Sequence, residues 1–375
     1  MGCSPSNASR VSNKVENNDR VCDPGPPYDP NAAAAANSNA NSDSNENSGG
    51  EGQIRNYFSF SSFILQNEEP VLFDWQFYNE IGKGAMSRVF LAVHLTKPQK
   101  CAAKVYNKGI ISRPTLGLEE PPYVAVDREI QIQANLVHRY VLPIIEVIDD
   151  DCSNSLIILM PFAENGTLQS YISANEITEA TLAICFYEVA EALRYVHSQN
   201  IVHRDLKPEN ILVFSPTIFV ISDFSASSKL ESGDEKLLDT KGSPAFLSPE
   251  ECGGESFSPK PADVWAYGVT IFSCLFHKLP FNLDEGQGKT VASTVYSVSQ
   301  LLETEELVIP TEPKVSEDAI ELLKSILVKD PTKRPTFEEI LKCPWFKDAI
   351  AVDEENKAHI EDNGDYEEDE EEECK

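Results

Sequence analysis

The chain has 375 residues, which allows two compact domains or one domain with two lobes. Its apolar fraction of 41% is enough for a sizeable core, but 31 Lys and Arg stand against 61 Asp and Glu. The resulting net charge of −30 argues against binding nucleic acid through its phosphates. The sequence contains no run of 18 apolar residues, so it predicts no transmembrane helix. Nine scattered cysteines without a Cys-x-x-Cys pair argue against a zinc site or a disulfide framework, and they are typical of a reducing compartment.

The N-terminal region is predicted to be a disordered tail over residues 1–70. Residues 1–50 contain ten Asn, a run of Ala and many Ser and Pro, so they cannot bury enough apolar surface to offset chain entropy. An aromatic patch follows at residues 57–65, YFSFSSFIL. We expect this patch either to dock on the domain behind it or to bind a partner.

The first six residues, MGCSPS, fit the pattern for N-myristoylation, with Gly2 as the acceptor. One myristoyl chain gives only marginal membrane binding, and a palmitoyl chain on Cys3 would supply a second anchor. Acylation predicts the cytoplasmic face of a membrane, most simply the plasma membrane. Without acylation the prediction is a cytoplasmic protein.

The C-terminal region, residues 348–375, is predicted to be an acidic disordered tail. Residues 351–375 hold 13 Asp or Glu against Lys357 and Lys375, and like charges repel at this density. The tail is interpreted either as a solubilising segment or as an interaction or autoregulatory one.

The middle of the chain changes pattern halfway, which predicts an α+β fold with two parts. Short β-like runs cover residues 90–93, 101–105, 144–148 and 156–160, with a helix expected around 127–137. From Thr178, a plausible N-cap, apolar residues recur at helical spacing, and residues 264–275 read as a buried helix. A β-rich part followed by a helical part suggests two lobes with a cleft between them.

A glycine-bearing turn, IGKGAMSRV at 81–89, lies between two β-like runs. Glycines let backbone amides approach a phosphate chain closely, although such a turn alone is typical of ordinary hairpins. The alternating strand AAKV carries a single cation, Lys104, and Glu129 follows 25 residues later on an expected helix. An ion pair between these two side chains would fix the ammonium beside a bound phosphate.

The segment IVHRDLKPENIL at 201–212 is far more specific, because Asp223 follows Asn210 by thirteen residues in ISDFS. The Asp205 carboxylate can orient an attacking hydroxyl group. Asn210 and Asp223 offer the oxygen ligands that Mg²⁺ prefers.

With these motifs in order and at the usual spacing, residues 77–347 resemble a eukaryotic protein kinase domain of the Ser/Thr type. The resemblance implies the bilobal protein kinase fold, with a small β-rich N-lobe (77–162) and a larger helical C-lobe (163–347). It implies an ATP- and Mg²⁺-dependent transfer of the γ-phosphoryl group to Ser or Thr hydroxyls of protein substrates. Asp205 would be the catalytic base, Lys207 would neutralise the γ-phosphate, and Lys104 would contact the α- and β-phosphates.

The resemblance also assigns binding residues. Asn210 and Asp223 would bind the metal ion, and Glu129 would pair with Lys104. The nucleotide site would be formed by Ile81, Gly82, Lys83, Gly84, Val89, Ala102, Lys104, Glu129, Met160, Pro161, Ala163 and Leu212. Ser243 would contact Asp205, Asp263 would brace the catalytic loop, and Glu250 would pair with Arg334.

Two residues depart from the family pattern. Ser225 replaces the Gly that usually follows Asp-Phe, and its Cβ narrows the choice of backbone conformation. Gln133 stands where an aliphatic residue normally packs near Phe224, so its amide is expected either to be partly exposed or to weaken the active packing. These two residues are the only support for an alternative in which the chain is a pseudokinase scaffold at a membrane.

The activation segment has Asp239 where family members often carry a phosphorylatable Thr, with Thr240 beside it. We expect Asp239 either to stand in for the phosphate and pair with Arg204, or to be a solvated loop acid. Phosphorylation of Thr240 stays open.

The insertion RPTLGLEEPP at 113–122 and the segment GSPAF at 242–246 resemble the calcium/calmodulin-dependent protein kinase kinases and related upstream kinases. This resemblance implies that other kinases are among the substrates; alternatively, the insertion is only a long loop in another branch. The acidic tail takes the place of the basic calmodulin-binding helix of that group, which argues against regulation by calmodulin.

Overall fold

The computed structural model describes residues 70–113, 121–149, 154–281 and 291–354. The N-terminal tail with Gly2 and Cys3, the aromatic patch at 57–65, most of the insertion at 113–122 and most of the acidic tail lie outside these residues. The chain divides into two compact units, and each is described by itself. No helix within the described residues is long and apolar enough to cross a membrane.

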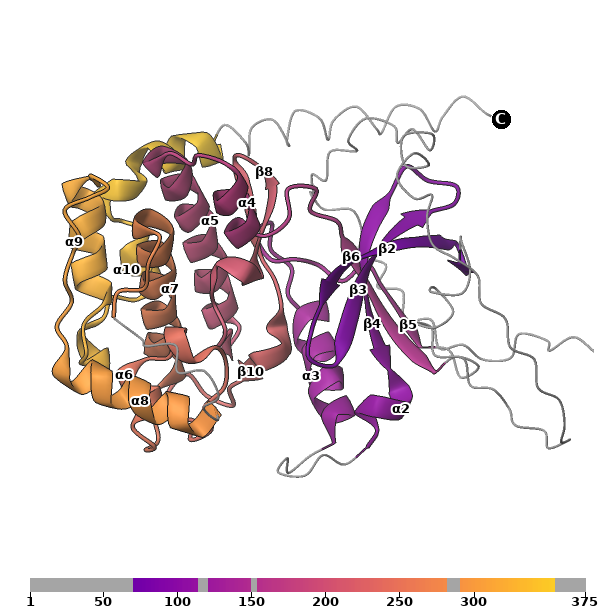
Figure 1. Cartoon of the computed structure of the whole chain (residues 1–375), viewed down its shortest axis with the longest axis horizontal. Coiled ribbons are helices and arrows are strands. Elements are labelled where there is room, and N and C mark those ends of the chain that lie inside the picture. Colours follow the sequence, from indigo (N-terminus) through magenta and orange to yellow (C-terminus); the bar gives the residue numbers. More distant parts are fainter. Residues whose placement is uncertain (1–69, 114–120, 150–153, 282–290, 355–375) are drawn as a thin grey trace, which may run out of the picture. The chain divides into compact units, whose positions relative to one another are not determined.

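The first unit contains a six-stranded antiparallel sheet with the strand order β1-β2-β3-β4-β6-β5 (Figure 1). Its elements are β1 (Val71–Leu72), β2 (Trp75–Lys83), β3 (Ser87–His94), β4 (Lys100–Asn107), α2 (Lys108–Ile111), β5 (Glu146–Asp149) and β6 (Ser155–Pro161). The β-like runs expected from the sequence are confirmed, although Ile144 and Ile145 precede β5 instead of belonging to it. The β-like run expected before the glycine-bearing turn is β2.

One face of this sheet forms the core of the first unit. Along β4 the exposure alternates, so that Cys101, Ala103 and Val105 are buried while Ala102 and Lys104 point to the opposite face. The buried face packs through Trp75, Phe77, Phe90, Ala92, Cys101, Ala103, Val105, Ile148, Ile157 and Leu159. The period-2 pattern therefore assigns Lys104 to the face that does not carry this core.

The second unit is mainly helical. Its helices are α3 (Pro122–Ala134), α4 (Leu168–Ala174), α5 (Glu179–Ser198), α6 (Pro249–Cys252), α7 (Pro259–Phe276), α8 (Val291–Thr304), α9 (Glu317–Ile326) and α10 (Phe337–Ile340). Short strands are β7 (Ile201–Val202), β8 (Ile211–Ser215), β9 (Ile218–Ile221) and β10 (Ser228–Lys229). The 3₁₀ turns are η2 (Pro208–Asn210), η3 (Phe224–Ala226), η4 (Pro244–Phe246), η5 (Pro331–Lys333) and η6 (Pro344–Phe346).

The helices predicted from periodicity are confirmed with adjusted ends. The side chain of Thr178 accepts a hydrogen bond from the amide of Thr181 and caps α5, as its position before the apolar pattern suggested. The helix expected around 127–137 begins at Pro122 instead, because proline is well tolerated in the first turn. It belongs by its contacts to the second unit.

Helix α7 is buried on nearly every side, which explains why it is apolar all round. It lies beside α5 in Figure 1, and the ring of Tyr267 on α7 packs edge to face against Phe186 on α5. A methyl group on Gly268 would lie 2.4 Å from a side-chain carbon of Ile326, so this position has no room for a side chain. The close approach of α7 and α9 therefore depends on glycine here.

Gly268→Ala is expected to destabilise the protein by about 1–3 kcal/mol through overpacking and to lower Tm by several degrees. Gly253→Ala is the matched control, because its added methyl group would meet only atoms at 3.6 Å or more. Thermal unfolding followed by circular dichroism measures both variants. Equal Tm values would contradict this account of the α7 packing.

Candidate active site

Four of the predicted nucleotide residues lie on one face of the sheet in the first unit. Val89 pairs with Lys104, Lys104 with Ile158, and Ala102 with Met160 across neighbouring strands. Because directly opposed residues point to the same side, Val89, Ala102, Lys104 and Met160 share the face opposite the core. The ammonium of Lys104 also lies 5.6 Å from the centre of the Tyr106 ring.

The glycine-bearing turn joins β2 to β3 at the end of this face. Gly82 pairs with Val89, and the amide of Gly84 donates to the carbonyl of Ser87 at 2.9 Å. Ile81 and Lys83 lie beside Gly82 at the end of β2, and Pro161 ends β6. Ser87 is the first residue of β3 and is buried.

The remaining predicted residues belong to the second unit. Glu129 is buried on α3, Ala163 is buried at the start of the segment that leads to α4, and Leu212 lies on β8. The pairing of Glu129 with Lys104 joins residues of different units and stays a prediction.

The catalytic-loop segment at 201–212 is fixed by the buried carboxylate of Asp263 on α7. This carboxylate accepts hydrogen bonds from the amides of His203 and Arg204, each at 2.8 Å, and contacts the His197 ring nitrogen at 2.8 Å. Burial alone would raise the pKa of Asp263, but the hydrogen bond and charge of His197, with the charge of His203 and the Arg204 amide, lower it overall. The carboxylate therefore stays ionised and can hold Arg204 in a left-handed backbone conformation, with φ of +68°.

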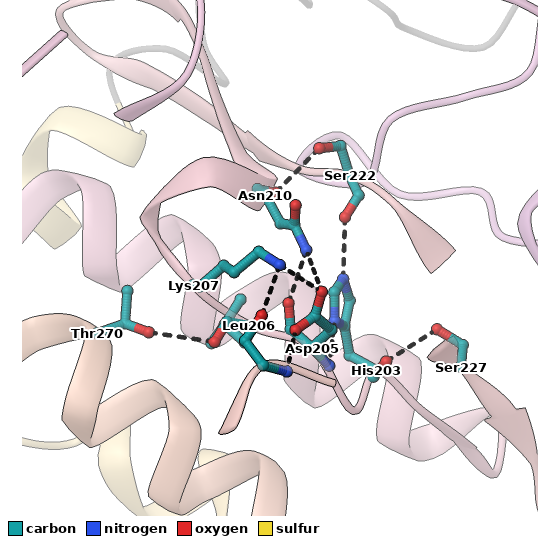
Figure 2. A network of polar contacts seen from close by, with 9 residues as sticks. His203, Asp205, Leu206, Lys207, Asn210, Ser222, Ser227 and Thr270 are labelled. Carbon is teal, nitrogen blue, oxygen red and sulfur yellow. Dashed lines mark hydrogen bonds and ion pairs between the residues drawn. The ribbon is translucent and has the colours of Figure 1, made fainter. Parts of the chain in front are cut away.

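Asp205 is oriented by three donors. Its Oδ2 atom accepts from the Lys207 ammonium at 2.7 Å and from the Asn210 amide at 3.1 Å, while its Oδ1 atom accepts from the Ser243 amide at 2.8 Å. Figure 2 shows Lys207 and Asn210 pointing toward this carboxylate from the same loop. Lys207 also donates to the Ser243 hydroxyl at 2.8 Å. The predicted contact of Ser243 with Asp205 is therefore present in the structure.

Asn210 connects the loop to the Asp-Phe-Ser segment. Its side-chain nitrogen donates to the Asp205 carbonyl at 2.7 Å, which makes the amide oxygen the atom able to bind a metal ion. Its carbonyl accepts from the amide and the hydroxyl of Ser222, at 2.8 and 3.0 Å (Figure 2). Asp223 follows Ser222 in the chain. The Asp223 carboxylate and the Asn210 amide oxygen therefore belong to two segments that are hydrogen-bonded to each other. This oxygen donor set fits Mg²⁺.

The two departures from the family pattern are both accommodated. Ser225 lies exposed in η3, and its φ is not among the positive values that would call for glycine. Gln133 is 1% exposed, so the expectation of partial exposure is wrong. Its amide instead donates to the Leu142 carbonyl at 2.9 Å, which supplies the partner that a buried amide needs.

The activation segment returns to the catalytic loop at Gly242. This residue has φ of +92°, and a methyl group on it would lie 2.3 Å from the Arg204 carbonyl, so only glycine fits.

Arg334 forms a bidentate ion pair with Glu250, at 2.6 and 2.8 Å, and its guanidinium lies over the Trp265 ring. The predicted pair of Glu250 and Arg334 is present.

Asp239 pairs with Arg204, as one of the two sequence interpretations predicts. Its carboxylate lies 3.2 Å from the Arg204 guanidinium and 3.2 Å from the Lys241 ammonium. Partial burial raises the pKa of Asp239, but Arg204 and then Lys241 outweigh it and lower the pKa below its ordinary value. Lys241 was not predicted from the sequence, because a lysine two residues after Asp239 carries no distinctive signal. His197 and Ser222 were not predicted either.

The comparisons with known proteins agree with this geometry. The family model described as "Protein kinase domain" matches residues 75–346, so the chain belongs to the protein kinase family. It is 33% identical over 279 residues to a protein of Dictyostelium discoideum named "probable serine/threonine-protein kinase", covering 72% of this chain and 38% of that relative. It is 33% identical over 289 residues to the serine/threonine-protein kinase ssp1 of Schizosaccharomyces pombe, covering 74% and 43%.

A third relative is the maternal embryonic leucine zipper kinase of Xenopus tropicalis, 31% identical over 285 residues, covering 75% of this chain and 40% of the relative. The chain thus spans about two fifths of the length of these curated relatives. The expected fold, a protein kinase domain with a β-sheet part and a helical part, is confirmed.

Asp239→Ala is expected to lower the activity of phosphatase-treated, bacterially produced protein by about tenfold, because Arg204 loses its anionic partner. Asp234→Ala, which removes an exposed acid of the same segment, is the matched control. Initial rates of phosphate incorporation into a generic protein substrate measure the difference. Equal rates for wild type and Asp239→Ala would show that Asp239 does not replace a phosphate.

Proposed function

We propose that this chain is a Mg²⁺-dependent protein serine/threonine kinase that transfers the γ-phosphoryl group of ATP to Ser or Thr hydroxyls of proteins. The observation that carries the proposal is the orientation of the Asp205 carboxylate by Lys207, Asn210 and the Ser243 amide. Membership of the protein kinase family and the names of the relatives support it.

In the proposed mechanism Asp205 is the catalytic base. A hydroxyl group of the substrate donates its hydrogen bond to the fixed carboxylate, which aligns its oxygen and accepts its proton during transfer. Lys207, held between Asp205 and Ser243, neutralises charge on the transferred phosphoryl group. Lys104 is the proposed contact of the α- and β-phosphates, and Glu129 is its proposed partner.

Asn210 and Asp223 are the proposed metal ligands, because both offer oxygen atoms and their segments are joined through Ser222. Bound Mg²⁺ would neutralise the phosphate oxygens and orient them for in-line displacement. The face of the sheet with Val89, Ala102 and Met160 is the proposed adenine side of the site in the first unit. Ala163 and Leu212 are the nucleotide contacts proposed for the second unit.

Asp205→Asn is expected to lower kcat by about 100-fold or more, because the amide cannot accept the hydroxyl proton. Asp348→Asn is the control, because it makes the same charge change at an exposed residue far from Asp205 in the sequence. The measurement is Mg²⁺-dependent ³²P transfer from ATP to a generic protein. Undiminished transfer by Asp205→Asn, or none by wild type, would favour a pseudokinase scaffold.

We further propose that the chain is an upstream kinase acting on other kinases at a membrane. The insertion at 113–122 and the GSPAF segment support the first part, and the MGCSPS start supports the second. Two acyl chains, on Gly2 and Cys3, would anchor the protein stably to the cytoplasmic face, whereas a single chain would not.

Gly2→Ala is expected to release the protein from membranes into the soluble fraction, and Cys3→Ser to leave only weak, reversible binding. Ser4→Ala, at a permissive position of the same motif, serves as the control. Cell fractionation and imaging of tagged protein give the distribution. Membrane binding by Gly2→Ala equal to that of wild type would remove the lipid anchor from this account.

A further inference from the structure

A short segment after α3, residues 137–142, is hydrogen-bonded to the strand that leads to the metal-binding carboxylate. The amide of Ile221 on β9 donates to the Tyr140 carbonyl, and the amide of Leu142 donates to the Ile221 carbonyl, both at 2.9 Å. Ile221 precedes Asp223 by two residues. The backbone position of Asp223 is therefore tied to the 137–142 segment.

The same segment also holds helix α3. The Leu142 carbonyl accepts the 2.9 Å hydrogen bond from Gln133, which lies one turn after Glu129 on this helix. Helix α3 packs directly against η3, which begins with the buried Phe224. The 137–142 segment thus connects the helix of Glu129 with β9, which ends two residues before Asp223, inside the second unit.

A buried acid near the end of the described chain, Asp353, also contacts this segment. Residues 347–354 are helical, and Asp353 is 2% exposed. Its carboxylate accepts a hydrogen bond from the Tyr140 hydroxyl, and the guanidinium of Arg139 lies 3.3 Å away. Burial, with a contribution from nearby Glu188, raises the pKa of Tyr140 well above its ordinary value, so the hydroxyl stays a donor.

We propose that Asp353 is a positioning residue for phosphoryl transfer, acting through Tyr140 and the 137–142 segment on the placement of Asp223 and α3. The inference rests on the proposed kinase function. A buried carboxylate that accepts a hydroxyl and faces a guanidinium is costly to assemble, and helix packing alone would not need it. The neighbouring Glu354 is exposed, which makes the contrast between two adjacent acids informative.

The experiment compares Asp353→Ala, Asp353→Asn and Tyr140→Phe with Glu354→Gln in the full chain. For each protein the Mg²⁺ concentration for half-maximal activity is measured at saturating ATP, together with kcat and Tm. Asp353→Ala and Tyr140→Phe are each expected to raise that Mg²⁺ concentration by about 3- to 10-fold, because the support of a metal ligand is loosened. Their double variant should be little worse than either single one, since both remove the same interaction.

Asp353→Asn is expected to retain part of the effect, because its amide oxygen can still accept from Tyr140, and Glu354→Gln should match wild type. Hydrogen–deuterium exchange gives a reading that needs no activity: exchange should quicken at residues 137–142 and 219–224 but not along α7.

If Tm falls while the Mg²⁺ dependence and this exchange pattern stay as in wild type, Asp353 is merely structural and the inference is overturned. If Asp353→Ala does not fold, Tyr140→Phe and Asp353→Asn decide by the same criteria. An inactive wild type would instead contradict the proposed function, and the exchange pattern would still test the coupling.

Discussion

The carboxylate of Asp263 is the interaction on which the described half of the site depends. It is 1% exposed and fully occupied by the amides of His203 and Arg204 and by the His197 ring. A buried carboxylate requires such partners, and these partners in turn force the backbone turn that begins the catalytic loop. Without this acceptor the amides of His203 and Arg204 would lose their hydrogen bonds, and with them the support for the left-handed conformation of Arg204 that precedes Asp205.

From that turn the loop builds outward in a fixed order. Asp205 accepts hydrogen bonds from Lys207 and Asn210, and the Asn210 carbonyl accepts one from the Ser222 hydroxyl. Ser222 immediately precedes Asp223, so these bonds help to position Asp223. The activation segment joins at Gly242, whose missing side chain allows contact with the Arg204 carbonyl. The result is a set of charged side chains whose positions are determined before any substrate arrives, as electrostatic catalysis requires.

The part of this arrangement that could be predicted from the sequence is the part with fixed local spacing. The separations among Asp205, Lys207, Asn210 and Asp223 identified the site, and the period of two along β4 placed Lys104. The Asp239–Arg204 pair could also be predicted, because Arg204 belongs to the recognisable segment at 201–212.

Contacts between distant parts of the chain could not be read in the same way. The acceptor for Gln133 is a backbone carbonyl, and because every residue has one, the sequence does not indicate which carbonyl it is. Asp353 meets Tyr140 across 213 residues and is one of 13 acids in a tail that otherwise reads as solvated charge. Asp353 differs from the exposed Glu354 by its burial, which depends on how the chain packs and cannot be predicted from composition.

The most direct test of the central claim is a crystal structure of the protein with Mg²⁺ and a non-hydrolysable ATP analogue. The account predicts a metal ion bound by the Asn210 side-chain oxygen and the Asp223 carboxylate, with the γ-phosphate beside Lys207 and facing Asp205. A nucleotide bound elsewhere, or a metal ion that touches neither Asn210 nor Asp223, would contradict it.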